Sequence, residues 1–389
     1  MAIVALARCG TYSCDELTQV FEESLSHIGF PVERFRGARV AVKPNLLTIA
    51  REDQAVITHP EFFRAVVRLV KTQGGTPVLV ESPAIHSLER VIKKTGYASV
   101  LEAEKIEIAD PTVVQTLHFE KAKRFKHLNI SKAYCEADMI LGLPKFKTHG
   151  ITAITGAVKN LFGAMPGLEK SKMHLRLPDH REFAAFLLDL YGALLHGFDP
   201  PKPMLHIMDA ILALEGEGPG QGGSPRQMNA VLAGEDAVAL DWAATQLACL
   251  DFRKVPTLVQ GFQREFGVAS PEAIQTAGAA VTDLQVRDFL PAKGNSLFSN
   301  ALRWPLNTQT FKNLFVERPV PIPETCSLCY QCQKICPAGA IGRAKNKASV
   351  PHYDYNTCIR CYCCLEICPE GAIEKRQGRL QWLLRVLER

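Results

Sequence analysis

The sequence predicts an α/β protein in two parts: a large domain built on a largely parallel sheet, then a small cysteine-rich α+β domain. Two observations support this fold class. Over roughly the first 290 residues, short β-rich runs alternate with amphipathic helical stretches, as expected when helices connect parallel strands. Near the C-terminus, the same cysteine pattern occurs twice, and the second copy, from Cys358, starts 32 residues after the first, from Cys326.

The chain has 389 residues, with 47% hydrophobic and 22% charged side chains, which is ordinary for globular proteins and allows two or three domains. Candidate strands in the large domain are residues 3–8, 39–42, 77–80, 106–109, 139–143, 204–208 and 228–232. Candidate helices are residues 15–27, 60–72, 87–94, 152–162, 181–195 and 236–247.

We expect four segments along the chain. The α/β domain covers residues 1–294 and a proline-rich linker covers 295–320. The cysteine-rich domain covers residues 321–375. Residues 376–389 then form an amphipathic helix, because Leu380, Leu383, Leu384 and Leu387 recur with helical spacing.

Each cysteine repeat has the spacing C-x2-C-x2-C-x3-C-P, which places three thiolates on one [4Fe–4S] cluster and gives the fourth to a neighbouring cluster. We therefore predict two [4Fe–4S] clusters with crossed ligands. One cluster takes Cys326, Cys329, Cys332 and Cys368, and the other takes Cys358, Cys361, Cys364 and Cys336. Cys363 is a spare cysteine because its use would break the two-residue gaps. Two zinc sites are the alternative, although zinc ribbons usually use two separated C-x2-C pairs.

This module resembles bacterial two-cluster ferredoxins over about 55 residues. The resemblance implies one-electron transfer and a redox partner protein that gives or takes the electrons. Iron–sulfur clusters would also offset the formal charge of +5, so the overall charge gives little support to nucleic-acid binding.

Polar side chains follow several predicted strands of the large domain. Lys43 and Asn45 follow residues 39–42, Glu81 follows 77–80, and Asp209 follows 204–208. The carboxyl ends of parallel strands meet at one edge of a sheet, where ligands bind. We therefore take Lys43, Asn45, Glu81 and Asp209 as candidate catalytic residues that orient a ligand, with Glu81 or a lysine as the proton donor.

The stretch from Lys145 to Arg181 is rich in lysine and histidine. It predicts a pocket for a small anionic ligand, because ammonium groups bind carboxylates and phosphates. The candidate substrate-binding residues are Lys145, Lys147, His149, Lys159 and Asn160. A solvated charged face, or a docking surface for an acidic redox partner, would give the same composition.

Five motifs identify a family resemblance. They are Lys43-Pro-Asn45, Leu143-Pro-Lys145-Phe-Lys147-Thr-His149, Gly156-Ala-Val-Lys159-Asn160-Leu-Phe-Gly163, Glu215-Gly-Glu-Gly-Pro219 and Asp236-Ala-Val-Ala-Leu-Asp241. Together they resemble the domain-of-unknown-function 362 family over about residues 35–250. Members of that family often carry a C-terminal ferredoxin module. The resemblance implies no particular reaction.

The leading functional hypothesis is an iron–sulfur oxidoreductase whose clusters relay single electrons to or from a small anion in the α/β domain. The rival hypotheses are a non-enzymatic electron carrier and a maturation factor, both of which would use the α/β domain to dock a protein. The N-terminus lacks the features of a signal peptide, and no apolar run reaches the roughly 18 residues of a membrane span. We therefore expect a cytoplasmic protein without a transmembrane segment.

Overall fold

The computed structural model describes residues 1–389 except 178, 265, 293–308, 345–349 and 379–389. Its centre is a ten-stranded sheet in the order β12-β1-β11-β10-β7-β2-β3-β4, with β8 and β9 attached beside β10. The strands are β1 (Ala2–Arg8), β2 (Arg39–Pro44), β3 (Thr76–Leu79), β4 (Glu107–Ile108), β7 (Met139–Leu143), β8 (Lys145–His149), β9 (Ala153–Thr155), β10 (Met204–Gly216), β11 (Gly223–Gly234) and β12 (Ile274–Gly278).

The sheet is largely parallel, which confirms the predicted fold class. The run β10-β7-β2-β3-β4 is parallel throughout, and β1 pairs with β12 in the same sense. Strand β11 is antiparallel to both of its neighbours, and β8 and β9 form an antiparallel hairpin. Every residue of β7 is buried, as expected for a strand covered by helices on both faces.

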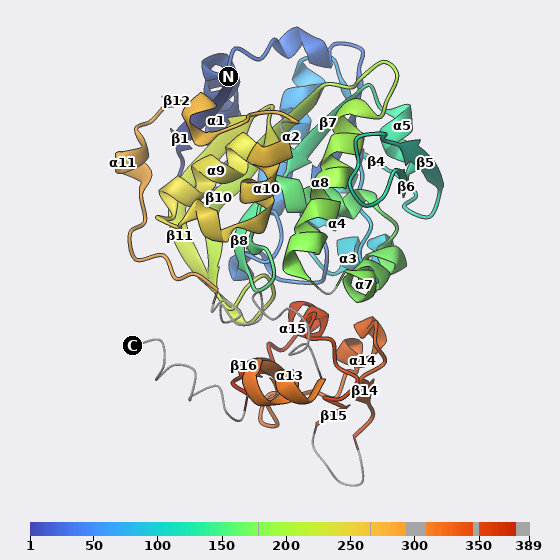
Figure 1. The fold of residues 1–389 in the computed structure, drawn as a ribbon. Helices are drawn as coiled ribbons and strands as arrows, with labels where there is room; N and C mark the ends of the chain where they lie inside the picture. Colours follow the sequence, from blue (N-terminus) through green and yellow to red (C-terminus); the bar gives the residue numbers. More distant parts are fainter. Residues whose placement is uncertain (178, 265, 293–308, 345–349, 379–389) are drawn as a thin grey trace.

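Alternating side chains of the central strands serve two separate hydrophobic cores. Val40 and Val42 of β2 pack in one core with Phe21 and Phe62, whereas Ala41 belongs to the other core with Phe186. The first core is covered by α1 (Cys14–His27), α2 (Pro60–Thr72), α3 (Leu88–Lys93) and α4 (Tyr97–Ala103). The second is covered by α8 (His180–His196), α9 (Ala237–Leu247) and α10 (Pro256–Arg264) (Figure 1).

Smaller elements complete the large domain. They are the hairpin of β5 (Val114–His118) and β6 (His127–Ser131), with α5 (Lys132–Glu136), α6 (Ala157–Asn160), α7 (Gly167–Arg176), α11 (Val281–Leu284) and short 3-10 turns. Residues 152–162 are not the single helix that we predicted, because β9 occupies the first part of this segment. Helix α6 starts only at Ala157, where Asp241 accepts the backbone N–H groups of Ala157 and Val158.

The small domain contains α13 (Gln309–Phe315), β13 (Arg318–Pro321), α14 (Gln331–Ile335), β14 (Ile341–Gly342), β15 (His352–Tyr353), α15 (Cys363–Ile367) and β16 (Ile373–Arg376). Strand β13 pairs with β16, so the last part of segment 295–320, predicted as a linker, belongs to this domain's own sheet. Residues 293–308 of that segment lie outside the described residues. The predicted helix over residues 376–389 also lies almost entirely outside the described part of the chain.

The small domain packs beneath the carboxyl edge of the large sheet, with α15 closest to it (Figure 1). Two buried contacts join the domains. The His149 Nε2 atom lies 2.9 Å from Glu366 Oε1, and Lys375 Nζ lies 3.2 Å from Glu217 Oε2. The loop between β10 and β11 also approaches α15, because a Cβ at Gly220 would lie 2.7 Å from the Glu366 carbonyl oxygen.

Candidate functional site

The strands that end in the predicted polar residues are neighbours in the sheet. Strands β10, β7, β2 and β3 lie side by side and parallel, so their carboxyl ends share one edge. Lys43 lies near the end of β2 and Asn45 follows it, while Glu81 follows β3. Strand β10 does not end at Asp209, because its antiparallel pairing with β11 carries it on to Gly216.

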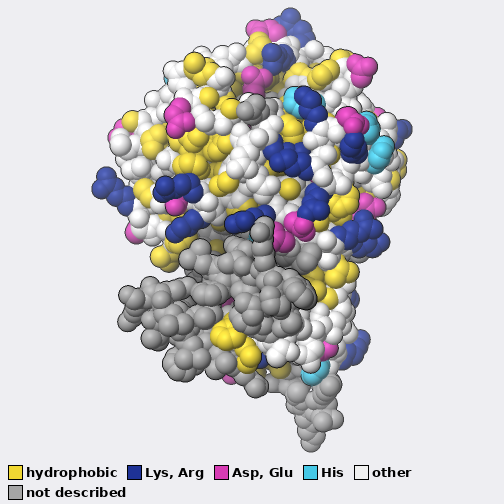
Figure 2. Space-filling view, in the orientation of Figure 1, with side chains coloured by type: hydrophobic (Ala, Val, Ile, Leu, Met, Phe, Trp, Pro, Cys, Tyr) yellow, Lys and Arg dark blue, Asp and Glu magenta, His cyan; other side chains and the backbone are white. Residues whose placement is uncertain are grey.

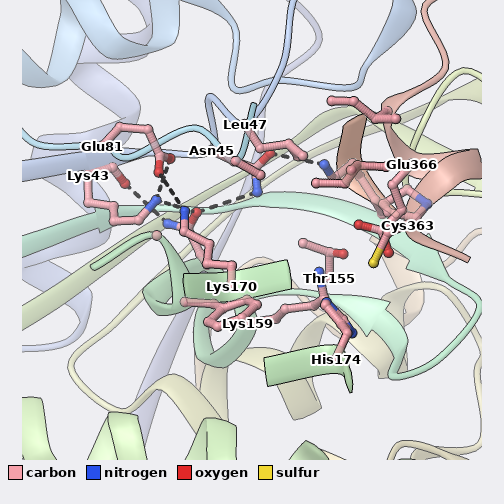
Figure 3. A pocket seen from close by; sticks show the side chains of 18 residues that line it. Lys43, Asn45, Leu47, Glu81, Thr155, Lys159, Lys170, His174, Cys363 and Glu366 are labelled. Atoms are coloured by element: carbon pink, nitrogen blue, oxygen red, sulfur yellow. Dashed lines mark hydrogen bonds and ion pairs between the residues drawn. The ribbon is translucent and has the colours of Figure 1, made fainter. Parts of the chain in front are cut away.

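A pocket of about 750 Å³, including its open mouth, lies between this edge and the small domain. Figure 3 shows Lys43 and Glu81 on one side of it, and Cys363 and Glu366 of α15 on the other. The α/β domain contributes Lys43, Asn45, Leu47, Glu81, Ala84, Lys147, Thr155, Lys159, Asn160, Phe162, Gly163, Lys170, His174 and Pro219. The small domain contributes Ile335, Cys363, Glu366 and Ile367.

A buried ion pair forms the floor of the pocket. Lys43 Nζ lies 2.7 Å from Glu81 Oε2 and also donates to the Asn160 side-chain oxygen at 3.2 Å. Burial alone would raise the pKa of Glu81, but Lys43 and Lys170 outweigh burial and lower it. Glu81 is therefore ionised at neutral pH. Gly163 allows this arrangement, because a Cβ there would lie only 2.2 Å from Lys43 Cε.

Three further lysines line the pocket, and their environments differ. Lys147 is fully buried and donates to Asn45 Oδ1 at 3.0 Å and to the Val56 carbonyl at 2.8 Å. Burial, together with the nearby charge of Lys159, holds the pKa of Lys147 well below its usual range. The two hydrogen bonds of Lys147 hold Asn45 in place beside the pocket.

Lys170 and Lys159 provide charge to the pocket. Burial lowers the pKa of Lys170 to about 8, although Glu81 opposes that shift from 3.9 Å. Lys159 is half-buried, and within the described residues it has neither an ion pair nor a hydrogen bond from its side chain. Its ammonium group points into the pocket in Figure 3. The lining therefore presents three ammonium groups, Lys43 included, against the carboxylates of Glu81 and Glu366.

His149 does not line this pocket but joins the two domains beside it. Its Nδ1 atom accepts the Ile151 backbone N–H at 2.9 Å, so the proton of a neutral ring lies on Nε2 and faces Glu366. Burial, reinforced by Lys159, lowers the pKa of His149 to about 3, so the ring is neutral. Glu366 is ionised, because His149 and Lys159 outweigh the effect of burial and lower its pKa.

Lys145 and Asp209 form a separate buried cluster. Lys145 Nζ lies 2.8 Å from Asp209 Oδ2 and 3.0 Å from the Tyr12 hydroxyl, which donates to Asp209 Oδ1. The Tyr12 ring stacks on His59 at 3.7 Å. Neither Lys145 nor Asp209 belongs to the lining of the pocket. The structure thus places Lys145 and Asp209 outside the pocket that Lys43, Asn45 and Glu81 line.

The cysteines of the two repeats all lie in the small domain, and we compare their neighbours with the crossed sets that the spacing predicts. Cys326, Cys329, Cys332 and Cys368, which we call the outer set, line one small cavity in the module. Cys336 lies near Cys358 and Cys361, and Cys364 lies near the same two residues. We call Cys336, Cys358, Cys361 and Cys364 the pocket-side set. Thiolate sulfurs are the ligands of [4Fe–4S] clusters, so the residue types fit the clusters that the spacing implies, although among the described residues no three possible ligands are arranged to hold a single metal ion.

The sequence did not single out every residue of the pocket. Lys170 and His174 lie within the basic stretch, where no pattern distinguishes them from its other lysines and histidines, and Thr155 lies in the segment predicted as a helix. Glu366 and Cys363 lay in the cysteine module, where only the cluster ligands gave a signal. Their role in the pocket depends on the contact between domains, which no local pattern encodes.

These features define a largely parallel α/β domain joined to an iron–sulfur electron-transfer module. Comparison with known families agrees. The model of a 4Fe-4S dicluster domain matches residues 325–373, which implies that the module transfers electrons. The chain belongs to the family described as domain of unknown function 362 (DUF362), whose model matches residues 40–246.

One relative and two solved structures are similar to the chain. The thylakoid-associated protein sll1697 of Synechocystis sp. is 35% identical over 257 residues, which cover 66% of this chain and 77% of the relative. The lactate racemase apoprotein of Thermoanaerobacterium thermosaccharolyticum has a TM-score of 0.37 and 12% identity, and a Thermotoga maritima protein has 0.36 and 10%. These matches cover 64% and 59% of the chain, which spans 57% of either structure.

Proposed function

We propose that the protein is an iron–sulfur oxidoreductase that exchanges single electrons with a small anion bound in the pocket between its two domains. The proposed module holds two [4Fe–4S] clusters, one on each cysteine set. The observation that carries the proposal is that the cysteine-rich domain forms one wall of the pocket. Cys363 and Glu366 line the pocket from within the segment that carries Cys361 and Cys364. A bound ligand would thus lie next to the pocket-side set.

The charges of the pocket support an anionic ligand. Lys159 has no partner among the described residues, and Lys170 donates to the Ser82 carbonyl and lies 3.9 Å from the Glu81 carboxylate. Ammonium groups in a partly buried site bind carboxylate or phosphate more strongly than they would in water. Apolar side chains, including Leu47, Phe162 and Ile367, line the rest of the pocket. A ligand with an anionic head and an apolar body fits this lining.

Several polar residues in and around the pocket have specific roles in this proposal. Lys159 and Lys170 bind the anionic group, and Asn45 and Asn160, held by Lys147 and Lys43, orient the ligand. Lys170 supplies the proton that accompanies reduction, because a pKa of about 8 suits proton transfer near neutral pH. Glu81 is ionised and keeps Lys43 and Lys170 in place. Lys145 and Asp209 support the sheet edge from outside the pocket.

The described residues do not favour nucleic acid as the ligand. On the face shown in Figure 2, Lys and Arg side chains are interspersed with Asp and Glu over the α/β domain. No helix in the described part of the chain is long and apolar enough to cross a membrane. All thirteen cysteines are unpaired, which is consistent with our proposal of a reducing, cytoplasmic location.

Native mass spectrometry on protein purified without oxygen tests the proposal. We expect iron and sulfide for two [4Fe–4S] clusters, together with an additional small mass that disappears in Lys159→Gln. Arg176→Gln is a matched control, because Arg176 is exposed and lies outside the pocket lining. Clusters without any bound small molecule, and no anion that binds in a Lys159-dependent way, would instead favour a carrier or maturation factor.

A further inference from the structure

One side chain that lines the pocket carries a buried polar atom that no described residue binds. The Thr155 hydroxyl has no hydrogen-bond partner, although the side chain is only 2% exposed. Among the described residues that line the pocket, no other buried side-chain nitrogen or oxygen is left without a partner. An unpaired buried hydroxyl destabilises a fold, because it has lost its hydrogen bonds to water. Such a group is expected where a bound ligand supplies the partner.

The hairpin of β8 and β9 directs this side chain towards the pocket. Thr155 is the last residue of β9 and pairs directly with Lys147 of β8. Residues that lie opposite each other in an antiparallel ladder point to the same face. Thr155 therefore shares its face with Lys147, and both side chains line the pocket. Figure 3 shows the Thr155 side chain inside the pocket, between Lys159 and Glu366.

The structure around Thr155 holds the hydroxyl in a fixed place. Threonine is β-branched, so rotation about its first side-chain bond is restricted. Helix α6 begins two residues later, where Asp241 accepts the backbone N–H groups of Ala157 and Val158. A hydroxyl that is fixed before the ligand arrives loses little freedom on binding. Its position can therefore select between ligands that differ by a single polar group.

The polar groups beside Thr155 indicate what the ligand carries at this point. Lys159, four residues later, offers an ammonium group that has no partner among the described residues. His174 also lines the pocket, and its ring stacks on Phe183 with the ring centres 4.4 Å apart. Burial lowers the pKa of His174 to about 4, so the ring is neutral. A neutral hydroxyl and a neutral imidazole beside an ammonium group fit an anion that also bears an uncharged oxygen.

We propose that Thr155 is a specificity-determining residue, whose hydroxyl donates to a hydroxyl or carbonyl oxygen of the ligand close to the anionic group that Lys159 binds. A hydroxy acid or an oxo acid with an apolar chain satisfies Thr155, Lys159 and the apolar lining together. An anion without the additional oxygen leaves the Thr155 hydroxyl unpaired and binds more weakly. This inference rests on the proposed function, because the anion occupies the same pocket.

Calorimetric titration of the full chain, purified without oxygen, tests this inference. The probes are hexanoate, each enantiomer of α-hydroxyhexanoate, and α-oxohexanoate, which share an anionic head and an apolar chain. We expect the wild type to bind a hydroxy or oxo probe roughly tenfold more tightly than hexanoate, as one additional hydrogen bond allows. Thr155→Val keeps the shape of the side chain and should lose this preference, with hexanoate affinity unchanged. Thr155→Ser retains a hydroxyl and should restore most of the preference.

The controls separate a role in recognition from a role in the fold. Thr116→Val is the matched control, because Thr116 also lies on a strand but is exposed and outside the pocket lining, and it should leave the preference intact. Chemical denaturation of the ligand-free protein should show that Thr155→Val is at least as stable as the wild type. A clear loss of stability would mean that the hydroxyl has a partner within the fold and would overturn the inference.

The affinities also separate this inference from the proposed function. Equal affinity of the wild type for all the probes, together with weaker binding of each in Lys159→Gln, would overturn the role of Thr155 and leave the anion pocket intact. An oxygen preference that persists in Thr155→Val would likewise overturn it. No binding of any probe to the wild type would count against both the role of Thr155 and the anion pocket.

Discussion

Two lysine–carboxylate pairs lie at the same edge of the sheet, and they differ in what surrounds them. Lys43 and Glu81 are 2.7 Å apart, and Lys145 and Asp209 are 2.8 Å apart, all four being almost completely buried. The Lys43–Glu81 pair faces the pocket and has Lys170 as a further neighbour. The Lys145–Asp209 pair is covered by Tyr12 and His59.

In the proposed function, this difference separates a pair that faces the ligand from a pair that stabilises the fold. Asp209 accepts hydrogen bonds from the Tyr12 hydroxyl and the His59 backbone N–H, so it links the N-terminal segment to β10 and α2. Glu81 accepts the backbone N–H groups of Leu46 and Ser82, and its pair with Lys43 shapes the pocket floor. The following predictions test this contrast, from the largest expected effect to the smallest.

The largest effect should come from Asp209→Asn. It leaves the Lys145 charge buried without a carboxylate, and breaking such a pair costs about 3–5 kcal/mol of unfolding free energy. Chemical denaturation without oxygen measures this loss. The double variant Lys145→Met/Asp209→Leu removes both charges and should recover much of the stability. Anion affinity of the folded protein should change little in either variant, and a complete loss of binding would contradict the structural role.

Glu81→Gln should affect stability less than Asp209→Asn does, and anion binding more. We expect a smaller loss of stability, about 1–3 kcal/mol, because Lys43 keeps the Pro44 carbonyl and the Asn160 oxygen as acceptors and the pocket admits water. Anion binding should become tighter, since one negative charge leaves the lining. Calorimetric titration of the anion identified by mass spectrometry measures this change. A stability loss as large as that of Asp209→Asn would remove the distinction between the pairs.

The contact between the domains supplies a third comparison. His149→Ala removes the close contact with Glu366 and should cost about 1–3 kcal/mol, because it leaves a largely buried carboxylate without its polar neighbour. Hydrogen exchange should rise in α15 and at the pocket wall. His118→Ala removes an exposed contact with Glu120 and should have almost no effect. Unchanged exchange in α15 would show that the pocket does not depend on this contact.

The smallest effect should be a dependence of anion affinity on pH. Lys170 has its pKa lowered to about 8, so it is charged below pH 8 and loses its charge as pH rises above that value. Affinity should therefore be highest near pH 7 and fall several-fold by pH 9. In Lys170→Met, the affinity should be lower throughout and nearly flat over this interval. An equal decline in Lys170→Met would assign the titration to another group.

Local patterns in the sequence account for much of this architecture. Alternating strands and helices predict the sheet, and the spacing of the cysteines predicts an iron–sulfur module, which the match to a 4Fe-4S dicluster domain confirms. Polar residues after β2 and β3 do reach the pocket. Asp209 does not, because β10 continues past it in a long antiparallel ladder with β11. The extent of that ladder depends on pairing with a distant segment rather than on residues next to Asp209.

The remaining features depend on contacts between distant segments. Lys159 and Asn160 are placed by α6, whose start is fixed by Asp241, 84 residues later in the chain than Ala157. Glu366 and Cys363 reach the pocket only because the module docks against the β10–β11 loop and His149. No periodicity or residue spacing in the α6 or α15 segment predicts these long-range contacts.

The most direct test of the account is electron exchange between the module and the molecule that occupies the pocket. The protein would be reduced without oxygen, freed of excess reductant and mixed with the anion identified by mass spectrometry, in both its oxidised and reduced forms. Visible absorbance would follow the clusters. We predict that one form of the anion changes the cluster oxidation state in the wild type, and does so much more slowly in Lys159→Gln. An anion that binds tightly but leaves the clusters unchanged in both directions would contradict the account.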